Sequence, residues 1–234
     1  MIKLVVCLLL TVVISYLLGS CNSAIIVVRL LKNEDIREHG SKNAGLTNTL
    51  RCFGKLPALF TLIGDLAKGI VAALLSILVF KLIIGAECFT NPPEWYPQVL
   101  DDMSVGYISG FFSIVGHIFP IYYGFKGGKG VLVSCSILLV IDPLTFVIII
   151  PFFALVLFIT RYVSVASISA AVFYPFLTFI LHYFVEGVPF NISITHFILV
   201  AFTGAVLVYM HRANIKRLRE GTENRFGSKK KAEK

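Results

Sequence analysis

Three polar segments of the sequence contain the residue types that bind phosphate groups, and each adjoins a long apolar run. The first, residues 41–51, supplies hydroxyl and amide donors together with one guanidinium group. Arginine suits phosphate because its planar fork donates to two oxygens at once. The side chains concerned are Ser41, Asn43, Thr47, Asn48 and Arg51. This composition predicts an anion site, although a solvated loop with a helix cap would have the same composition.

The second segment is rich in glycine, runs from Gly116 to Gly130 and ends in Gly127-Gly128-Lys129-Gly130. Glycines let successive backbone N–H groups turn toward one anion, and the helix expected next adds its positive end. The spacing is not that of a Walker loop, because Lys129 is followed by glycine rather than by Ser or Thr. We expect a phosphate-holding nest here; a flexible turn at the membrane edge is the alternative.

The third segment follows the last apolar run. His211 and Asn214 are three residues apart, so they share one face of a helix that leaves the membrane. Glu223 comes soon after and is expected either to pair with a cation or to act as a reactive acid. Ser164 and Ser167, after a shorter polar break at Arg161, also share a helix face and are further candidates for substrate binding.

Two ionisable residues lie inside an apolar run, where charges are rare and often functional. Asp65 and Lys68 are three residues apart and can pair across one helical turn. A structural pair that neutralises itself explains them equally well, so their role stays open. No role is assigned to His39, His182 or His196.

The composition requires lipid as the main solvent of this chain. Of its 234 residues, 57% are hydrophobic and only 15% are charged. A soluble domain of this length would leave large apolar patches exposed to water. No internal repeat interrupts the sequence, so residues 1–234 are expected to form one membrane domain.

Apolar runs of about 20 residues predict spanning helices, since a helix rises ~1.5 Å per residue. The apolar block 131–160 is too long for one span and is broken by Asp142-Pro143, which predicts a hairpin with a short first arm. The fold expected is an all-α polytopic membrane protein with seven transmembrane helices. The expected spans are residues 3–28, 56–84, 104–122, 131–141, 144–160, 163–184 and 194–210, followed by a basic cytoplasmic tail, 211–234.

The placement of charge predicts the orientation of these spans. Eighteen of the 21 Lys and Arg residues lie in 29–55, in 126–129, at Arg161 and in 212–234. The loops between them carry acidic residues, so the positive-inside rule puts the amino terminus outside and the carboxyl terminus in the cytoplasm. The net charge of +8 therefore points to anionic headgroups rather than nucleic acid. The residues expected at the headgroups are Arg212, Lys216, Arg217, Arg219 and Lys229-Lys230-Lys231.

The five cysteines show no CxxC pair and no metal-ligand spacing, so neither a disulfide framework nor a metal site is predicted. Leu18-Gly19-Ser20-Cys21, after an apolar run, has the look of a lipoprotein cleavage site. The residues that follow are those of a membrane enzyme rather than of an exported domain, which favours the spanning interpretation.

Taken in order, residues 41–51, 116–130, 161–167 and 211–223 resemble the motifs of the bacterial acyl-phosphate-dependent glycerol-3-phosphate acyltransferases, the PlsY family. The resemblance implies a seven-helix enzyme of the bacterial inner membrane. It implies transfer of an acyl group from acyl phosphate to the 1-hydroxyl of sn-glycerol 3-phosphate, which yields lysophosphatidic acid and phosphate, the first step of phospholipid synthesis. It also implies no cofactor, an active site on the cytoplasmic side and a contact with the enzyme that makes acyl phosphate.

The resemblance also implies roles for individual residues. Those needed for activity are Ser41, Arg51, His211 and Asn214, and those that bind substrate are Asn43, Thr47, Asn48, Gly127, Gly128, Lys129, Gly130, Ser164 and Ser167. Glu223 matches a structural acid. The chain departs from the family at Lys42, where Gly is usual, and at Leu46, Cys21-Asn22, Ala213 and Leu132.

The residues themselves favour positioning over nucleophilic catalysis. Acyl phosphate is already activated, so orientation and charge stabilisation remain to be supplied. The sequence has no His with an Asp five residues later and no evident catalytic triad. The resemblance implies that the acyl phosphate's own phosphate takes the hydroxyl proton, with His211 as general base the rival role.

Two other functions are considered. An organic-phosphate transporter would use the same donors, but the two related halves common in transporters are not seen in the sequence. A structural membrane subunit would leave the donors unexplained.

Overall fold

The computed structural model describes residues 1–227, and over these residues the chain is helical without strands. The predicted headgroup contact of Lys229-Lys230-Lys231 lies outside the described residues. The helices are α1 Ile2–Ser20, α2 Ser23–Lys32, α3 Leu46–Phe53, α4 Lys55–Ile83, α5 Asp102–Ile118, α6 Val131–Ile141, α7 Pro143–Thr160, α8 Val163–Ile180, α9 Phe190–Met210 and α10 Arg212–Arg219. Single turns of 3₁₀-helix lie at Ile36–Glu38 and Ile121–Tyr123, and a π-helical turn, Leu181–Val185, extends α8.

Six helical stretches in the described part of the chain are long and apolar enough to cross a membrane. The remaining predicted span, 131–141, corresponds to α6. This helix has 11 residues and is therefore only ~16 Å long, about half the hydrocarbon thickness. The predicted hairpin is confirmed: Asp142 caps α7 by accepting the Thr145 N–H at 3.0 Å, and Pro143 is its first residue. The count of seven spans and their orientation stay predictions.

The first predicted span, 3–28, lies in a stretch, Ile2–Lys32, that is long and apolar enough to cross a membrane, but the helix is broken within it. α1 ends at Ser20, and α2 begins at Ser23 with Asn22 as its N-cap. The Asn22 side chain accepts the Ile25 N–H at 3.2 Å, the standard way in which asparagine starts a new helix. Hydrophobicity continues across this break, so the apolar run concealed it.

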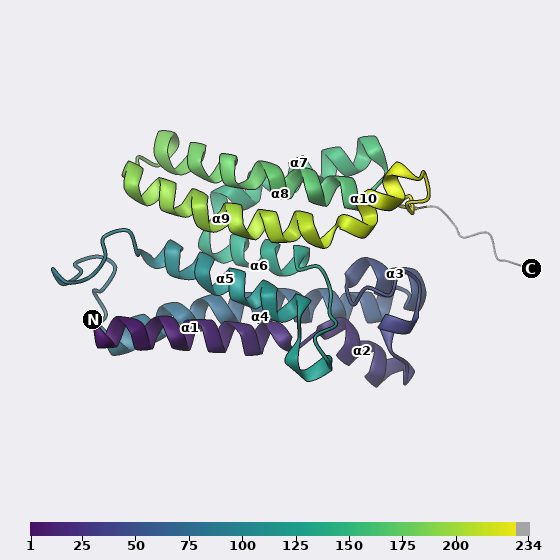
Figure 1. Ribbon diagram of the computed structural model, residues 1–234, viewed down its shortest axis with the longest axis horizontal. Coiled ribbons are helices and arrows are strands. Elements are labelled where there is room, and N and C mark those ends of the chain that lie inside the picture. The colour runs from purple at the N-terminus through teal and green to yellow at the C-terminus, as the bar shows by residue number, and fades with distance from the viewer. Residues whose placement is uncertain (228–234) are drawn as a thin grey trace, which may run out of the picture.

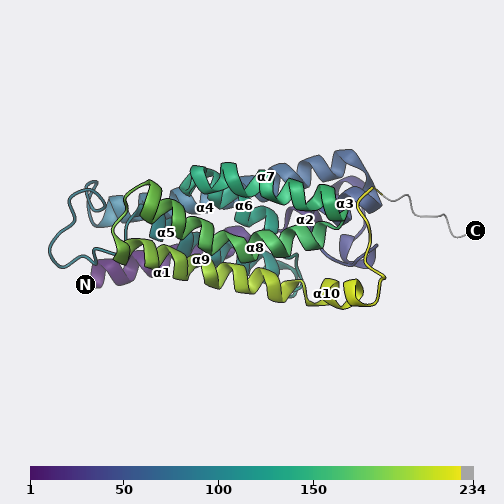
Figure 2. The ribbon, with the colours of Figure 1, turned by 90° about the horizontal axis from the view of Figure 1, so that it is seen from above.

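The long helices form two layers with α6 between them (Figures 1 and 2). α1, α4 and α5 pack together on one side, whereas α7, α8 and α9 form the other. α6 contacts α4, α5 and α7. Met1 lies at one end of the molecule, and α2, α3 and α10 gather at the opposite end (Figure 1). The short α6 leaves room between the layers near that second end.

α1 and α5 touch backbone to backbone through glycine. A Cβ on Gly19 would lie 2.1 Å from the Ser113 carbonyl oxygen, and one on Gly116 would lie 2.2 Å from that of Tyr16. Small residues at such positions let membrane helices approach closely. This contact fixes the end of α5, from which the glycine-rich segment departs.

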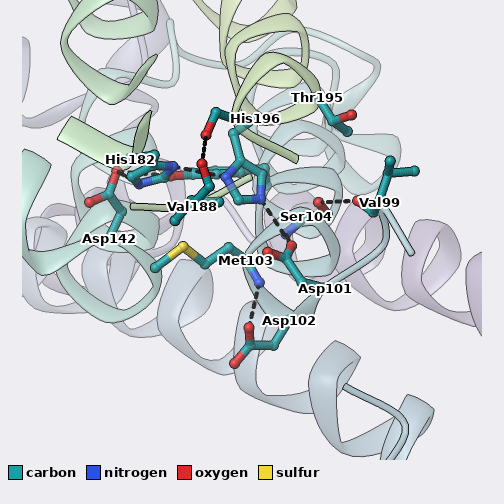
Figure 3. A network of polar contacts seen from close by, with 12 residues as sticks. Val99, Asp101, Asp102, Met103, Ser104, Asp142, His182, Val188, Thr195 and His196 are labelled. Atoms are coloured by element: carbon teal, nitrogen blue, oxygen red, sulfur yellow. Dashed lines mark hydrogen bonds and ion pairs between the residues drawn. The ribbon is translucent and has the colours of Figure 1, made fainter. Parts of the chain in front are cut away.

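A buried polar network ties the helices together near the end where Met1 lies (Figure 3). His182 and His196 face each other with their Nδ1 atoms 2.8 Å apart. The Nε2 of His196 lies 2.9 Å from Asp101, and the Nε2 of His182 lies 3.4 Å from Asp142. Tyr107 donates to Asp142 at 2.8 Å. The network thus joins α5, the α6–α7 turn, the π-helical turn and α9.

Candidate active site

A cavity of about 820 Å³ opens between the two layers. All residues predicted to be catalytic or to bind substrate line it, in company with Asp65 and Glu223: Ser41, Asn43, Thr47, Asn48, Arg51, Gly127, Gly128, Lys129, Gly130, Ser164, Ser167, His211 and Asn214. Three segments far apart in the sequence therefore meet at one place. They are the loop between α2 and α4 (the first loop, residues 33–54), the loop between α5 and α6 (the glycine loop, residues 119–130) and residues 211–226.

Asn48 organises the first loop with both ends of its amide. Its Oδ1 accepts the Ser41 N–H at 3.0 Å, and its Nδ2 donates to the His39 carbonyl at 2.9 Å. The side chain is buried on α3. We predicted Asn48 as a substrate ligand, but its hydrogen bonds go to the loop backbone, so in this structure it shapes the loop.

Four other polar side chains of the first loop are unengaged. Within residues 1–227, the side chains of Ser41, Asn43, Thr47 and Arg51 make no hydrogen bond or ion pair with the protein. All four line the cavity. Groups that have no protein partner and face a cavity are free to donate to an anion.

Lys42 stands in the first loop with φ +58°. Glycine adopts this left-handed backbone region freely, whereas a residue with a side chain is strained there by about 1–2 kcal/mol. The glycine usual in the family at this position therefore suits the turn, and this chain keeps the turn despite its lysine.

Arg37 clamps the first loop to the glycine loop. Its guanidinium donates to the Tyr123 carbonyl at 2.6 Å and to the Lys126 carbonyl at 3.3 Å. Asp35 holds the same guanidinium through a 2.7 Å ion pair. The hydrogen bond from Arg37 keeps the pKa of Asp35 well below its usual range. The two loops are thus fixed together at their outer edge.

The glycines of the glycine loop serve close packing more than anion binding. The N–H groups of Gly127 and Gly128 donate to the carbonyls of Ile118 at 3.0 Å and His117 at 3.1 Å. A Cβ on Gly128 would lie 2.1 Å from the His117 Nε2. The predicted nest is therefore wrong for these two N–H groups. The anion donors left in this loop include the side chains of Lys126 and Lys129 and the uncapped first turn of α6 after Gly130.

Glu223 is the centre of a hydrogen-bonded cluster that we call the tail hub: Ser164, Asn214, Arg217 and Glu223. Its Oε1 accepts from Ser164 at 2.8 Å and from Asn214 at 2.6 Å, and its Oε2 accepts from Arg217 at 2.6 Å. Burial alone would raise the pKa of Glu223, but these donors outweigh it and lower the pKa. The hub fixes residues 211–223 against the start of α8.

Lys129 reaches the tail hub from the glycine loop, since its Nζ donates to the Asn214 Oδ1. Burial lowers the pKa of Lys129 to about 8; Glu223 opposes this, and the nearby cations Arg217 and Arg51 add to it. An anion in the cavity would relieve this mutual repulsion, so the cluster of cations favours phosphate.

His211 ends α9 with its ring turned to the backbone. The Nδ1 lies 2.7 Å from the Leu207 carbonyl, which can only accept, so Nδ1 carries the proton and Nε2 is the acceptor. Burial, supported by Lys129, lowers the pKa of His211 to about 4. The ring is therefore neutral at physiological pH.

The structure also reveals residues that the sequence interpretation missed. Arg217 was assigned to lipid headgroups but lies in the tail hub and lines the cavity. His117 lines the cavity and contacts Lys68, whereas Lys68 itself does not line it. The three-residue spacing of Asn214 and Arg217 could have indicated the position of Arg217, whereas nothing nearby in the sequence indicated that of His117. Ser167 lines the cavity but donates to its own helix at Val163.

The cavity continues from its polar end into an apolar region. The residues there belong to α6, α7 and α8: Cys135, Leu138, Phe146, Ile149, Ile150, Phe153, Ala170, Ala171 and Tyr174. Such a space has the chemistry to take a hydrocarbon chain, whereas the polar end takes anions. Among the described residues, no cluster of three His, Cys, Asp or Glu could hold a metal ion.

Comparison with known proteins assigns the chain to a family. The family model for glycerol-3-phosphate acyltransferase matches residues 9–221. Relatives with that name from Chlorobaculum parvum and Chlorobaculum tepidum are 36% and 38% identical, covering 92% and 93% of this chain and 94% and 97% of theirs.

Solved structures agree with this assignment. A crystal structure of PlsY, an integral membrane glycerol 3-phosphate acyltransferase, in its glycerol 3-phosphate form has a TM-score of 0.72 and 31% identity, covering 94% of this chain and 96% of that one. Its lysophosphatidic acid form gives a TM-score of 0.70 at 30% identity, over 94% and 95% of the two chains. The chain is a multi-pass membrane acyltransferase and belongs to the glycerol-3-phosphate acyltransferase family.

Proposed function

We propose that this enzyme transfers an acyl group from acyl phosphate to the 1-hydroxyl of sn-glycerol 3-phosphate, releasing lysophosphatidic acid and inorganic phosphate. The observation that carries the proposal is the composition of one cavity. Its polar end has unengaged donors and six cationic side chains, Arg51, Lys129 and Arg217 among them, and its other end is apolar. Two phosphate-bearing substrates, one with a hydrocarbon chain, match this division.

The substrates' phosphates are held by groups from all three segments. Arg51, Ser41 and Thr47 donate from the first loop, and Lys129 donates from the glycine loop. His211 and Asn214 orient glycerol phosphate, and the tail hub keeps them in register. The acyl chain lies along α6, α7 and α8. Holding both reactants in this geometry lowers the barrier by removing the entropic cost of their encounter.

The chemical step needs no protein base. The 1-hydroxyl oxygen attacks the acyl carbonyl carbon, the bond from that carbon to the phosphate oxygen breaks, and the hydroxyl proton passes to the departing phosphate. The cations stabilise the charge that develops on the carbonyl and phosphate oxygens. With its pKa at about 4, His211 has little driving force to remove a hydroxyl proton at neutral pH, which supports the substrate-assisted step over the rival role.

We further propose that residues 1–234 form one domain of the bacterial inner membrane with seven spans, counting α6. The amino terminus lies outside, and the cavity faces the cytoplasm. The basic residues near α2, α3 and α10 support this orientation, because the positive-inside rule applies to the end of the molecule where these helices gather. The enzyme that makes acyl phosphate would meet the protein on the same side.

Phosphate release by the purified protein in detergent tests the function. Release is expected only when acyl phosphate and glycerol 3-phosphate are both present. Ser41→Ala and Arg51→Ala should each lower turnover by about 100-fold or more while the unfolding temperature is retained. Full activity in either variant would contradict the site assignment.

The alternatives make different predictions. Uptake of glycerol 3-phosphate by vesicles that contain the purified protein, without phosphate release, would indicate the transporter. Product formation from acyl-CoA at the rate seen with acyl phosphate would contradict the proposed donor. Competition between the two donors is therefore the second measurement.

A further inference from the structure

The Lys68 ammonium group lies close to three polar atoms of the protein. Its Nζ lies 2.8 Å from the Asp65 Oδ1, 2.8 Å from the His117 Nδ1 and 3.2 Å from the Cys21 carbonyl. An ammonium group has three donors and no acceptor. The side chain is only 5% exposed. Because Lys68 is engaged inside the protein and does not line the cavity, any effect it has on the reaction acts through its neighbours.

The first neighbour is the break between α1 and α2. Because the helix stops at Ser20, the Cys21 carbonyl has no helical partner to accept from, and the Lys68 ammonium donates to it. The next residue, Asn22, donates from its side chain to the carbonyl of Ala44 at 3.4 Å. Ala44 lies in the first loop beside Asn43. The contact at Cys21 thus connects Lys68 to the loop that holds the unengaged donors.

The second neighbour is the end of α5. His117 accepts from Lys68 through its ring and accepts from Gly128 N–H through its carbonyl. Its ring also packs so closely on Gly128 that a Cβ there would lie 2.1 Å from Nε2. A movement of His117 would therefore move the glycine loop and, with it, Lys129.

The third neighbour is a carboxylate that lines the cavity. Asp65 is 1% exposed and faces a space that has to receive anions. Paired with Lys68, it is neutralised; removing one partner of a buried pair leaves an uncompensated charge, which is strongly destabilising. Here that charge would also repel phosphate.

From these contacts we propose that Lys68 is a positioning residue, a buried cation that sets the first loop and the glycine loop at the spacing required by two phosphate groups. It acts through Cys21 and Asn22 on one loop, through His117 on the other, and it neutralises Asp65 between them. The role rests on the proposed function, because the spacing matters only if two phosphates bind.

The test separates positioning from charge and from folding. Lys68→Met removes the ammonium at similar length and leaves Asp65 charged, so it should lower both kcat/KM and the unfolding temperature. Asp65→Asn combined with Lys68→Met removes the uncompensated charge as well. In that double variant the unfolding temperature should largely recover. Because the loops are no longer tied together, kcat/KM should stay about 100-fold below wild type and KM should rise for both substrates.

Three further variants sharpen the result. Lys81→Met makes the same change at an exposed position of the same helix, α4. It should leave kcat/KM, both KM values and the unfolding temperature unchanged from wild type. His117→Asn keeps an acceptor near the Nδ1 position, so it should retain more activity than His117→Leu.

A folded double variant with wild-type KM values and kcat would overturn the proposal. Equal activity of His117→Asn and His117→Leu would overturn the link through the His117 ring. If the wild-type protein itself transfers no acyl group, the proposed function fails instead. Glycerol 3-phosphate binding, measured as a shift in unfolding temperature, then still reports whether Lys68→Met disturbs the site.

Discussion

Lys129 joins the glycine loop to the tail hub, and two other cations, Arg51 and Arg217, lie near its ammonium. Its pKa of about 8 means that the charge is present below that pH and is lost as the pH rises through it. If this charge binds phosphate, kcat/KM should fall as the pH rises above about 8, since kcat/KM reports ionisations of the free enzyme. Above about pH 7 the substrate phosphates no longer change charge, so the decline is assigned to the protein.

Lys129→Arg is the matched variant, because arginine keeps its charge at every accessible pH. Its kcat/KM should be lower than that of wild type at pH 7 but should lack the fall near pH 8. If kcat/KM still falls near pH 8 in Lys129→Arg, the ionisation responsible belongs to another group. Because His211 is neutral above about pH 4, it should add no inflection to the plot of kcat/KM against pH between about pH 4 and pH 8.

Lys42 gives a prediction about backbone strain. Because its φ of +58° suits glycine, Lys42→Gly should relieve about 1 kcal/mol of strain, partly offset by the greater freedom of glycine in the unfolded chain. Lys42→Val should be destabilising, since a β-branched residue is disfavoured at positive φ. Unfolding temperatures in detergent check both. A Val variant as stable as the Gly variant would contradict the strain argument.

At the scale of helices, the His182–His196 network joins four elements (Figure 3), and neither histidine lines the cavity. His196→Phe removes the partner of Asp101 and of the His182 ring, so it should destabilise the protein by about 3 kcal/mol. Thr195→Ala, on the same helix, should change stability by no more than about 0.5 kcal/mol. Unfolding by heat in detergent provides the measurement.

Activity separates this network from the active site. Well below the unfolding temperature, His196→Phe should retain kcat/KM within about threefold, since neither His196 nor its partners Asp101 and His182 line the cavity. Loss of activity without loss of stability would show that the network is coupled to the reaction.

For the whole molecule, orientation in the membrane can be tested with a native cysteine. Cys52 is exposed on α3, at the end of the molecule that carries the cavity. In right-side-out vesicles, an impermeant thiol reagent should label Cys52 only after permeabilisation. The loop variant Glu94→Cys should be labelled in intact vesicles, and Cys52→Ser should remove the protected signal. The opposite pattern would contradict an outside amino terminus.

Much of the architecture could be predicted from the sequence because the signals are local. Hydrophobic run length marked the long helices, and Asp142-Pro143 marked the hairpin, since a proline and a capping aspartate act on adjacent residues. The break at Asn22 was missed, because an apolar run continues on both sides and a single cap outweighs it. α6 was found, but its passage through the membrane depends on how its neighbours bury it.

The sequence alone determined which chemical groups are available to this protein: the donors Ser41, Asn43, Thr47 and Arg51, the lysine after two glycines, and the histidine of the third segment. Only the tertiary structure decided which polar groups bond to other parts of the protein. The Asn48 side chain hydrogen-bonds to the backbone of the first loop, and the N–H groups of Gly127 and Gly128 donate to the end of α5. Lys68 contacts three partners, two of them about 50 residues away in the sequence. A hydrogen bond needs its partner within about 3 Å, and that proximity arises only when distant parts of the chain pack together.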